Sequence, residues 1–504
     1  MRGRLLAAAG VAALVWSGAA LAQQQAAPAQ MPATLPPAAP APGPAMTLRD
    51  ALVRTYASNP TLMAQRQTLR GLDEGVALAR ARGRPQVNGD AAFNQDVITR
   101  NLGENQRNFN VGGDVRVPLF AGGTIRNAVR AANTRVEAGR ADLRATEGDI
   151  FTEAVAAYMD VIRDRSIVQL NQNQVRVLET NLQANRDRFE VGDLTRTDVA
   201  QSEARLALAR SNLAIAEGTL ETSEENYERV IGVAPGDLQP PPPLPSLPGA
   251  PGQAMEVALA NNADLASIAA QARAAGFDVR AARGERLPLI SGVSSIRYSD
   301  SLGTNNINVG GGGGLVPENT TSAGVGLTLS VPLYQGGAAG ARVRQAQAQR
   351  GQLLEQAIGV ERLVIANARA SYARYVAAND AIESNTIAVA ANELALEGTR
   401  AEQTVGTRNV LDVLNAEQEL LNSQVALVTA RRDAYVAGFD LLNSMGQAEA
   451  EDLNLEDGPL YDPTVNYNRY SGSWNDWDDG PMIRPVATRT APETANSPVT
   501  ELPR

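Results

Sequence analysis

Apolar residues recur every seven positions in two segments of the chain. In the first segment the large side chains are Val199, Leu206, Leu213, Leu220 and Tyr227, and mostly small ones follow three residues later at Ser202, Ala209, Ala216, Ser223 and Val230. The second segment repeats both rows, from Val413 to Leu441 and from Ala416 to Ser444. A seven-residue period with one large and one small row predicts closely packed, left-handed helix pairs. Generic packing of a helical bundle would explain the rows equally well.

The positions of proline predict how far these helices extend. The chain has 28 prolines, but none lies between Pro118 and Pro235 or between Pro332 and Pro459. Because proline inside a helix costs ~3 kcal/mol, both segments can hold long helices. We predict helices over residues 122–191, 194–232, 336–404 and 408–446. The periodicity is interrupted at Val-Gly pairs, which predicts helix-hairpin tips at Gly192 and Gly406.

Alternating apolar and polar residues predict two β-hairpins, at about 86–117 and 289–331. In residues 86–97, for example, Val87 and Phe93 alternate with Asn88 and Asn94. Runs of about ten such residues are typical of outer-membrane β-barrel strands. Four strands cannot close a barrel, and open sheet edges are not tolerated in lipid. A membrane location would therefore require an oligomer.

The combination of hairpin and long helices occurs twice. Val117-Pro-Leu-Phe-Ala-Gly-Gly123 recurs 214 residues later (331 − 117) as Val331-Pro-Leu-Tyr-Gln-Gly-Gly337, and the same offset relates Glu203 to Glu417. Such self-similarity indicates an internal repeat. We expect strand-to-helix turns at Pro118, Gly122 and Gly123 and at Pro332, Gly336 and Gly337. The second copy has about 11 extra residues, which we place in an exposed loop containing Gly310–Gly314.

The remaining segments are assigned from composition. Residues 1–22 have two arginines, a short apolar run and an Ala-Leu-Ala end, which predicts a secretory signal peptide. An Ala/Pro-rich spacer (23–46), repeat 1 (47–233), a Pro-rich linker (234–252), repeat 2 (253–446) and an acidic tail (447–504) follow. The acidic composition predicts a disordered tail. A docking motif around Trp474 and Trp477 is the alternative.

The missing residue types exclude many activities. The chain has no cysteine, histidine or lysine, so all 45 basic residues are arginine. Disulfides, Cys/His zinc sites, histidine-dependent nucleophiles and the lysine of a phosphate-binding loop are therefore excluded. We expect no enzyme, no metal and no cofactor. The tail carries −7 of the net charge of −10, which leaves the body nearly neutral and argues against nucleic-acid binding.

Over about residues 47–446 the chain resembles the TolC-type outer-membrane channel-tunnels. The resemblance rests on the doubled order of helix, hairpin and very long helix, on the two Val-Pro-Leu-Phe/Tyr-x-Gly-Gly turns, and on the stretch Val405-Gly-Thr-Arg-Asn-Val-Leu-Asp-Val-Leu-Asn-Ala416. It implies a mainly α fold with membrane β-structure, in which a homotrimer shares one 12-stranded barrel with four strands per chain. The barrel would continue into a coiled-coil tunnel in the periplasm of a Gram-negative bacterium.

The resemblance also implies a gate at the periplasmic end of the tunnel. Arg408 matches the arginine of the family's latch, Thr197 and Asp198 match its partners, and Asp412 matches an aspartate of the constriction. Two positions depart from the family pattern, since Asn415 replaces a second aspartate and Gln403 replaces a tyrosine. One aspartate ring instead of two implies weaker cation selectivity. We expect an inter-helix ion pair between Arg408 and Asp198.

The resulting interpretation is a passive channel in the outer-membrane lipid. It would receive cargo from an inner-membrane transporter, of the ABC or RND type, through a periplasmic adaptor protein. Type I protein secretion and small-molecule efflux both stay open, with a slight preference for partners that include protein export. The alternative is a periplasmic coiled-coil adaptor or spacer without a pore, which would leave the two hairpins unexplained.

Overall fold

A computed structural model describes residues 46–97, 107–302, 319–455 and 460–487. All of these belong to one compact unit, Pro44–Arg504. The predicted signal peptide (1–22), the predicted spacer apart from its last residue, and the Gly310–Gly314 run lie outside the described residues. None of the described helices combines the length and the apolar content needed to cross a bilayer.

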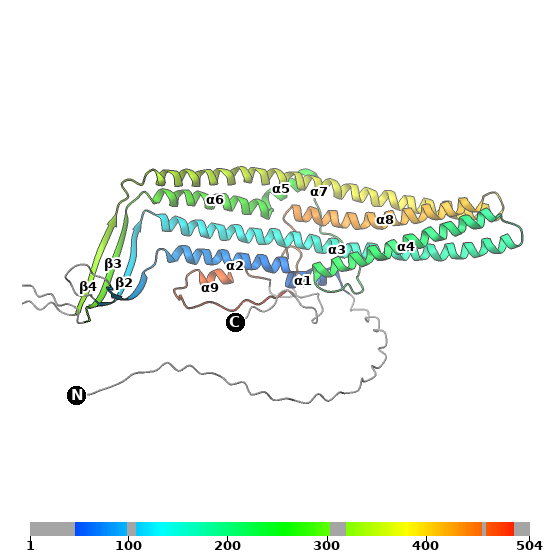
Figure 1. Ribbon diagram of the computed structural model, residues 1–504. Coiled ribbons are helices and arrows are strands. Elements are labelled where there is room, and N and C mark those ends of the chain that lie inside the picture. Colours follow the sequence, from blue (N-terminus) through cyan, green and yellow to red (C-terminus); the bar gives the residue numbers. More distant parts are fainter. Residues whose placement is uncertain (1–45, 98–106, 303–318, 456–459, 488–504) are drawn as a thin grey trace, which may run out of the picture. The chain divides into compact units, whose positions relative to one another are not determined.

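Each repeat contains two short helices, two strands and two long helices. The first repeat comprises α1 (Leu48–Ser58), α2 (Pro60–Ala81), β1 (Gln86–Gln95), β2 (Arg107–Ala121), α3 (Thr124–Glu190) and α4 (Arg196–Ile231). The second comprises α5 (Pro251–Asn261), α6 (Ala263–Gly284), β3 (Leu289–Asp300), β4 (Asn319–Ser330), α7 (Ala338–Thr404) and α8 (Val410–Ser444), and α9 (Val465–Tyr470) follows. Figure 1 shows the strands at one end of the helices and the α3/α4 and α7/α8 hairpin tips at the other.

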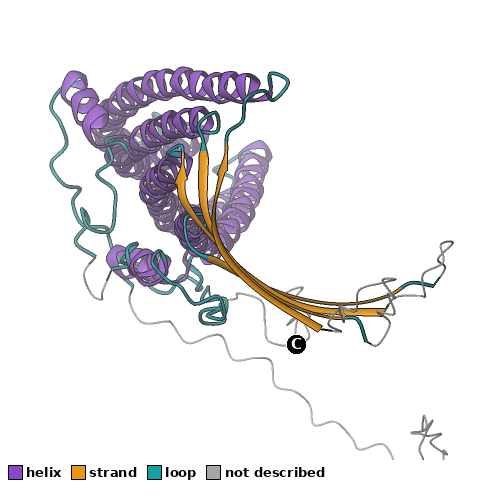
Figure 2. Ribbon diagram, turned by 90° about the vertical axis from the view of Figure 1, so that its left-hand side faces the viewer, coloured by secondary structure: helices purple, strands orange, loops and turns teal. Residues whose placement is uncertain are grey.

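The four strands form one antiparallel sheet in the order β1-β2-β3-β4. The central pair, β2 and β3, joins the two repeats, with Asn110 opposite Ser299. The strands leave the helices as a long twisted ribbon (Figure 2). Because β1 and β4 each have a single strand neighbour within the described chain, both sheet edges offer unpaired backbone groups.

The predicted turn at Pro118 was placed too early, because β2 continues to Ala121. Pro118 lies within the strand opposite Ser291, and the register shifts between Pro118 and Phe120. A bulge at this point tolerates a residue that cannot donate a backbone hydrogen bond. Pro332, in contrast, follows the end of β4.

Paired glycines with positive φ connect strand to helix in both repeats. Gly122 and Gly123 have φ of +59° and +79°, and Gly336 and Gly337 have φ of +60° and +83°. Side chains are disfavoured in this region of backbone space. At Gly122 there is also no room, since a Cβ would lie 2.3 Å from the carbonyl oxygen of Gly284. Glycine is therefore required where the first repeat turns against the second.

The largest apolar cluster lies where the short and long helices meet. Its centre contains Tyr158 on α3 and Tyr227 on α4, both fully buried. The Tyr158 hydroxyl donates to the carbonyl oxygens of Met46 (3.0 Å) and Gln239 (2.6 Å). These bonds attach the start of the described chain and the Pro-rich linker to the long helices.

The tail is not disordered over its described residues, contrary to the prediction from composition. The Arg66 guanidinium of α2 lies over the rings of Tyr56 and Tyr461, at 4.4 and 4.8 Å from their centroids. The Tyr467 hydroxyl donates to Asn133 of α3 (3.0 Å), and Asn466 donates to Asp73 of α2. The prediction from the acidic composition overlooked the tyrosines of the tail, which contact arginines and apolar side chains on α2 and α3.

Candidate functional site

Both helix-hairpin tips have the same local geometry. Gly192 and Gly406 turn the chain with φ of +83° and +79°. Thr195 caps α4 and Asn409 caps α8. In each case the carboxylate of the third helical residue, Asp198 or Asp412, accepts a hydrogen bond from the backbone N–H of the cap residue. Such capping boxes satisfy backbone groups that a helix end leaves free. The two aspartates of the candidate gate thus also belong to capping boxes.

Asp198 is held as a carboxylate by its cap partner. The Thr195 hydroxyl and backbone N–H donate to its Oδ2 at 2.7 and 2.9 Å. These hydrogen bonds, the side-chain bond first, lower the pKa of Asp198. Neighbouring Thr197 is exposed in the first turn of α4.

Arg408 pairs within its own hairpin. Its Nε donates to Glu402 of α7 at 2.8 Å, and Nη1 lies 4.0 Å from Asp412. The hydrogen bond to Glu402 raises the pKa of Arg408, with smaller contributions from the charges of Glu402 and Asp412. The expected pair with Asp198 does not form within the described chain. Glu402 is six residues away on the same hairpin and takes its place.

Asn415 connects the two coiled coils. Its Oδ1 accepts a hydrogen bond from Arg205 of α4 at 2.7 Å, which links α4/α3 of the first repeat to α8 of the second. The sequence analysis treated Asn415 as a missing aspartate. In the structure an amide at this position still binds an arginine. Gln403 is half-buried near the end of α7.

Glu417 is a second connection that the sequence analysis missed. Its side chain is 2% exposed on α8, and its Oε1 accepts from Arg400 of α7 (2.8 Å) and from Asn181 of α3 (2.9 Å). Its Oε2 has no hydrogen-bond partner among the described residues. The internal repeat could have identified this ion pair from the sequence. Arg400 and Glu417 are the 214-residue equivalents of Arg186 and Glu203, which form a half-exposed pair at 2.6 Å.

An apolar layer accompanies these polar links. It contains Leu178 and Leu182 of α3, Leu206 and Ala209 of α4, and Val410 and Leu414 of α8. Leu206 and Ala209 belong to the rows of large and small residues found in the sequence, whereas Val410 and Leu414 lie outside those rows. The layer packs α8 against the α3/α4 hairpin.

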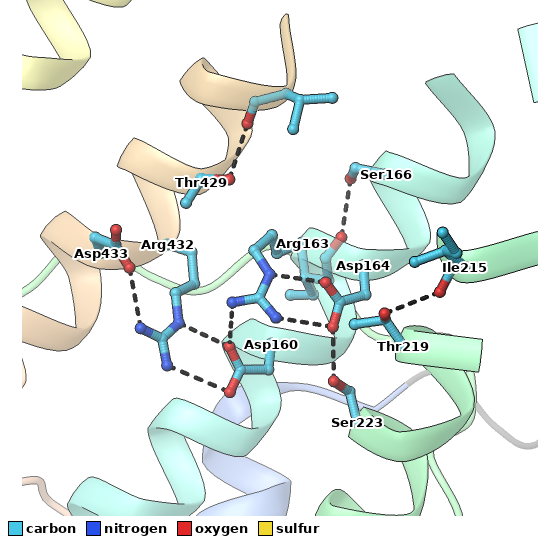
Figure 3. A network of polar contacts seen from close by, with 12 residues as sticks. Asp160, Arg163, Asp164, Ser166, Ile215, Thr219, Ser223, Thr429, Arg432 and Asp433 are labelled. Carbon is cyan, nitrogen blue, oxygen red and sulfur yellow. Dashed lines mark hydrogen bonds and ion pairs between the residues drawn. The ribbon is translucent and has the colours of Figure 1, made fainter. Parts of the chain in front are cut away.

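A larger polar network fixes α8 further from the tips (Figure 3). Asp160 of α3 accepts from Arg432 of α8 at 2.8 Å and lies 2.8 Å from Arg163. Asp164 accepts from Arg163 at 2.7 Å and from Ser223 of α4 at 2.6 Å. Three helices of two repeats thus share one set of charges. Such a network holds them in one relative position.

The doubled hairpins and long helices are those expected of an outer-membrane channel subunit, and comparison with known proteins agrees. The profile of the family described as "Outer membrane efflux protein" matches residues 51–233 and 254–447, one segment in each repeat. The chain belongs to this family.

Named relatives cover most of the chain. Outer membrane efflux protein BepC of Brucella suis is 35% identical over 428 residues, which is 85% of this chain and 91% of BepC. Outer membrane protein TolC of Escherichia coli is 23% identical over 369 residues, or 69% and 74% of the two chains. The structure of the Campylobacter jejuni CmeC outer membrane channel superposes with a TM-score of 0.71 at 14% identity, covering 84% of this chain and 89% of CmeC.

Several predictions from the sequence are thereby confirmed. The TolC-type resemblance and the mainly α fold with four membrane strands per chain are correct. The protein is located in the outer membrane, and as a member of an efflux channel family it is not an enzyme. Outer-membrane location explains why large apolar side chains such as Val87, Val325 and Leu327 lie exposed on the strands.

Proposed function

We propose that three copies of this chain form one continuous conduit across the outer membrane and the periplasm. The unpaired edges of β1 and β4 support this proposal, because in lipid they must find strand partners. Three four-stranded sheets joined edge to edge give the 12-stranded barrel expected from the sequence. The long helices then extend the barrel into a periplasmic tunnel.

The tunnel is gated at the hairpin tips. The observation that carries this proposal is the pair of links between the coiled coils, Arg205 to Asn415 and Asn181 to Glu417. Both cross from the first repeat to α8, so widening the entrance by moving α7/α8 outward requires breaking them. Arg408 and Asp412 line the same end and place charge at the mouth.

Transport through this conduit is passive. Energy comes from an inner-membrane ABC or RND-type transporter, coupled through a periplasmic adaptor protein. The relative BepC is named as an efflux protein, which supports efflux as one route. Type I protein secretion is the second candidate, supported by a relative named alkaline protease secretion protein AprF of Pseudomonas aeruginosa, which is 27% identical over 319 residues.

Two measurements test the proposal together. Negative-stain electron microscopy of protein extracted from outer membranes should show three-fold end views and a tapered body well over 100 Å long, as the helical segments and the barrel require. Planar-bilayer recordings of the same preparation should show a small, stable conductance. Rods that remain soluble without detergent, and no conductance, would replace the channel with the periplasmic-spacer interpretation.

A further inference from the structure

After α9, which lies beside α2, the tail forms a loop at residues 471–479. This loop carries two exposed tryptophans. Trp477 is 92% exposed and Trp474 is 69% exposed. The loop is closed at its base, where Gly480 lies against the Tyr470 ring with φ of +70°. Local bonds shape it: the Trp477 N–H donates to Asn475 (3.1 Å) and the Asn475 N–H donates to Ser473 (3.3 Å). The tryptophans are thus presented on an ordered turn.

Contacts with α2 fix the position of this loop along the molecule. Arg80 donates to the carbonyl oxygen of Ser471 at 2.9 Å. Arg84 donates to the carbonyl oxygens of Ser473 and of Gly472 (3.1 Å), and its guanidinium lies 4.6 Å from the centroid of the Trp474 ring. Arg84 stands two residues before the start of β1. The loop therefore lies where α2 ends and the sheet begins.

This level is the boundary between the helices and the membrane strands. A Cβ at Gly83 would lie 3.0 Å from Ile125 in the first turn of α3, and Gly122 packs against Gly284 and Leu287 just before β3. The three junctions therefore meet at one height. Exposed apolar side chains gather there, among them Leu119, Leu287, Leu333 and Tyr334. The contact between Arg84 and Trp474 places the tryptophan loop at this same level.

We propose that residues 471–479 anchor the channel to the periplasmic leaflet of the outer membrane, with Trp474 and Trp477 in the lipid headgroup region. Tryptophan is enriched at membrane interfaces because its ring is apolar and its N–H is polar. Asp476, Asp478 and Asp479 lie in the same loop as the two tryptophans and disfavour an anionic surface. The occupant is therefore a zwitterionic leaflet, whose ammonium groups complement the aspartates.

This inference goes beyond the gate and the cargo and depends only on the outer-membrane location. The anchor holds α2 and α3 at a fixed depth through the tail contacts described above. Cargo type and partner pump do not enter the argument.

Tryptophan fluorescence tests the anchor directly. The chain has three tryptophans, and two of them are in this loop. The full-length protein is reconstituted into phosphatidylethanolamine/phosphatidylcholine vesicles whose acyl chains carry bromine either near the headgroup or near the bilayer centre. The double variant W474F/W477F supplies the background. Conductance of the same vesicles, measured separately, establishes that the protein has inserted as a channel.

We expect headgroup-proximal bromine to quench the loop signal at least twofold, and deep bromine to quench it less. Replacing a third of the lipid by phosphatidylglycerol should reduce the quenching. If bromine has no effect and aqueous acrylamide quenches fully, the loop lies in water and the proposal is wrong. If neither quencher acts, another protein surface covers the tryptophans, which also overturns it. The single variants W474F and W477F report which indole lies deeper.

Discussion

Removing the Glu417 carboxylate should loosen the periplasmic entrance. Glu417→Ala deletes the bond from Asn181 and the pair with Arg400. A hydrogen bond to a buried carboxylate contributes about 2 kcal/mol, whereas the pair with Arg400 lies within the moving α7/α8 hairpin and does not favour the closed state over the open one. Against the loss of the bond from Asn181, the change relieves the unpartnered Oε2, a gain of about 1 kcal/mol. The closed state thus loses about 1 kcal/mol per subunit.

In a trimer whose three α7/α8 hairpins move together, this loss amounts to about 3 kcal/mol. Since each 1.4 kcal/mol is tenfold, the ratio of open to closed channels should rise on the order of a hundredfold. Single-channel recording in planar bilayers measures this ratio as open probability. The structure supplies a matched control, Glu203→Ala, which removes the equivalent pair with Arg186 on the surface of the first repeat.

The control should leave the recordings unchanged, because its pair is half-exposed on both sides and joins only α3 to α4. Trimer integrity is checked for both variants by cross-linking in detergent. Equal open probabilities for Glu417→Ala, Glu203→Ala and wild type, with trimers intact, would refute the assignment of Glu417 to the gate.

Three further predictions concern other parts of the molecule. Arg408→Ala should raise the open probability only modestly, because Arg408 pairs with Glu402 in its own hairpin; a rise as large as that of Glu417→Ala would instead indicate a latch to a neighbouring coiled coil. Burial, aided by the charge of Glu449, raises the pKa of Glu147 from 4.5 to about 7. The folded state therefore favours the protonated acid, so stability should be full below pH 4.5 and fall by about 3 kcal/mol as the pH rises to 7. Glu147→Gln should flatten thermal unfolding against pH over this window, and an unchanged pH profile would disprove the assignment. Gly122→Ala should prevent trimer assembly, measured by cross-linking in detergent, because it adds a backbone clash to an unfavourable φ, whereas Gly336→Ala has nearly the same φ and open space and should lose about 1–2 kcal/mol at most and still assemble; equal behaviour of the two variants would contradict the close contact with Gly284.

The helices and strands were predictable because their signals are local. Proline-free segments, alternation of apolar residues and paired glycines are each visible in short stretches of sequence, and they correspond to α3, α7 and the four strands. The order of the sheet was not encoded in this way, since the β2–β3 pairing joins segments far apart in the chain. The prediction of a disordered tail was wrong for a related reason. Tyr461 and Tyr467 acquire order from arginines on α2, which composition cannot reveal.

Some residues of the candidate gate were predictable from the sequence, whereas the contacts between the coiled coils were not. Asp198 and Asp412 were assigned through the family resemblance, and their places in the capping boxes follow from neighbours three residues away. The links that cross between coiled coils depend on which faces of α4 and α8 meet. Asn415 was noticed only as a departure from a pattern, and Glu417 only as a repeat-equivalent of Glu203. Burial separates the two glutamates, and burial follows from the tertiary arrangement.

The pairing of β2 with β3 sets an order of events in biogenesis. The side chains of Asn110 and Ser299 bond across 189 residues of sequence, so β2 stays half-paired until β3, the first strand of the second hairpin, has been delivered. Contacts this distant in sequence form slowly, because closing the intervening loop costs conformational entropy before the contact adds any stabilisation. The α3/α4 hairpin can form early from local contacts, while β1 and β2 wait as an exposed two-stranded ribbon. Such a ribbon is prone to aggregate, so this chain should depend heavily on a periplasmic holding chaperone during the interval before its sheet is complete.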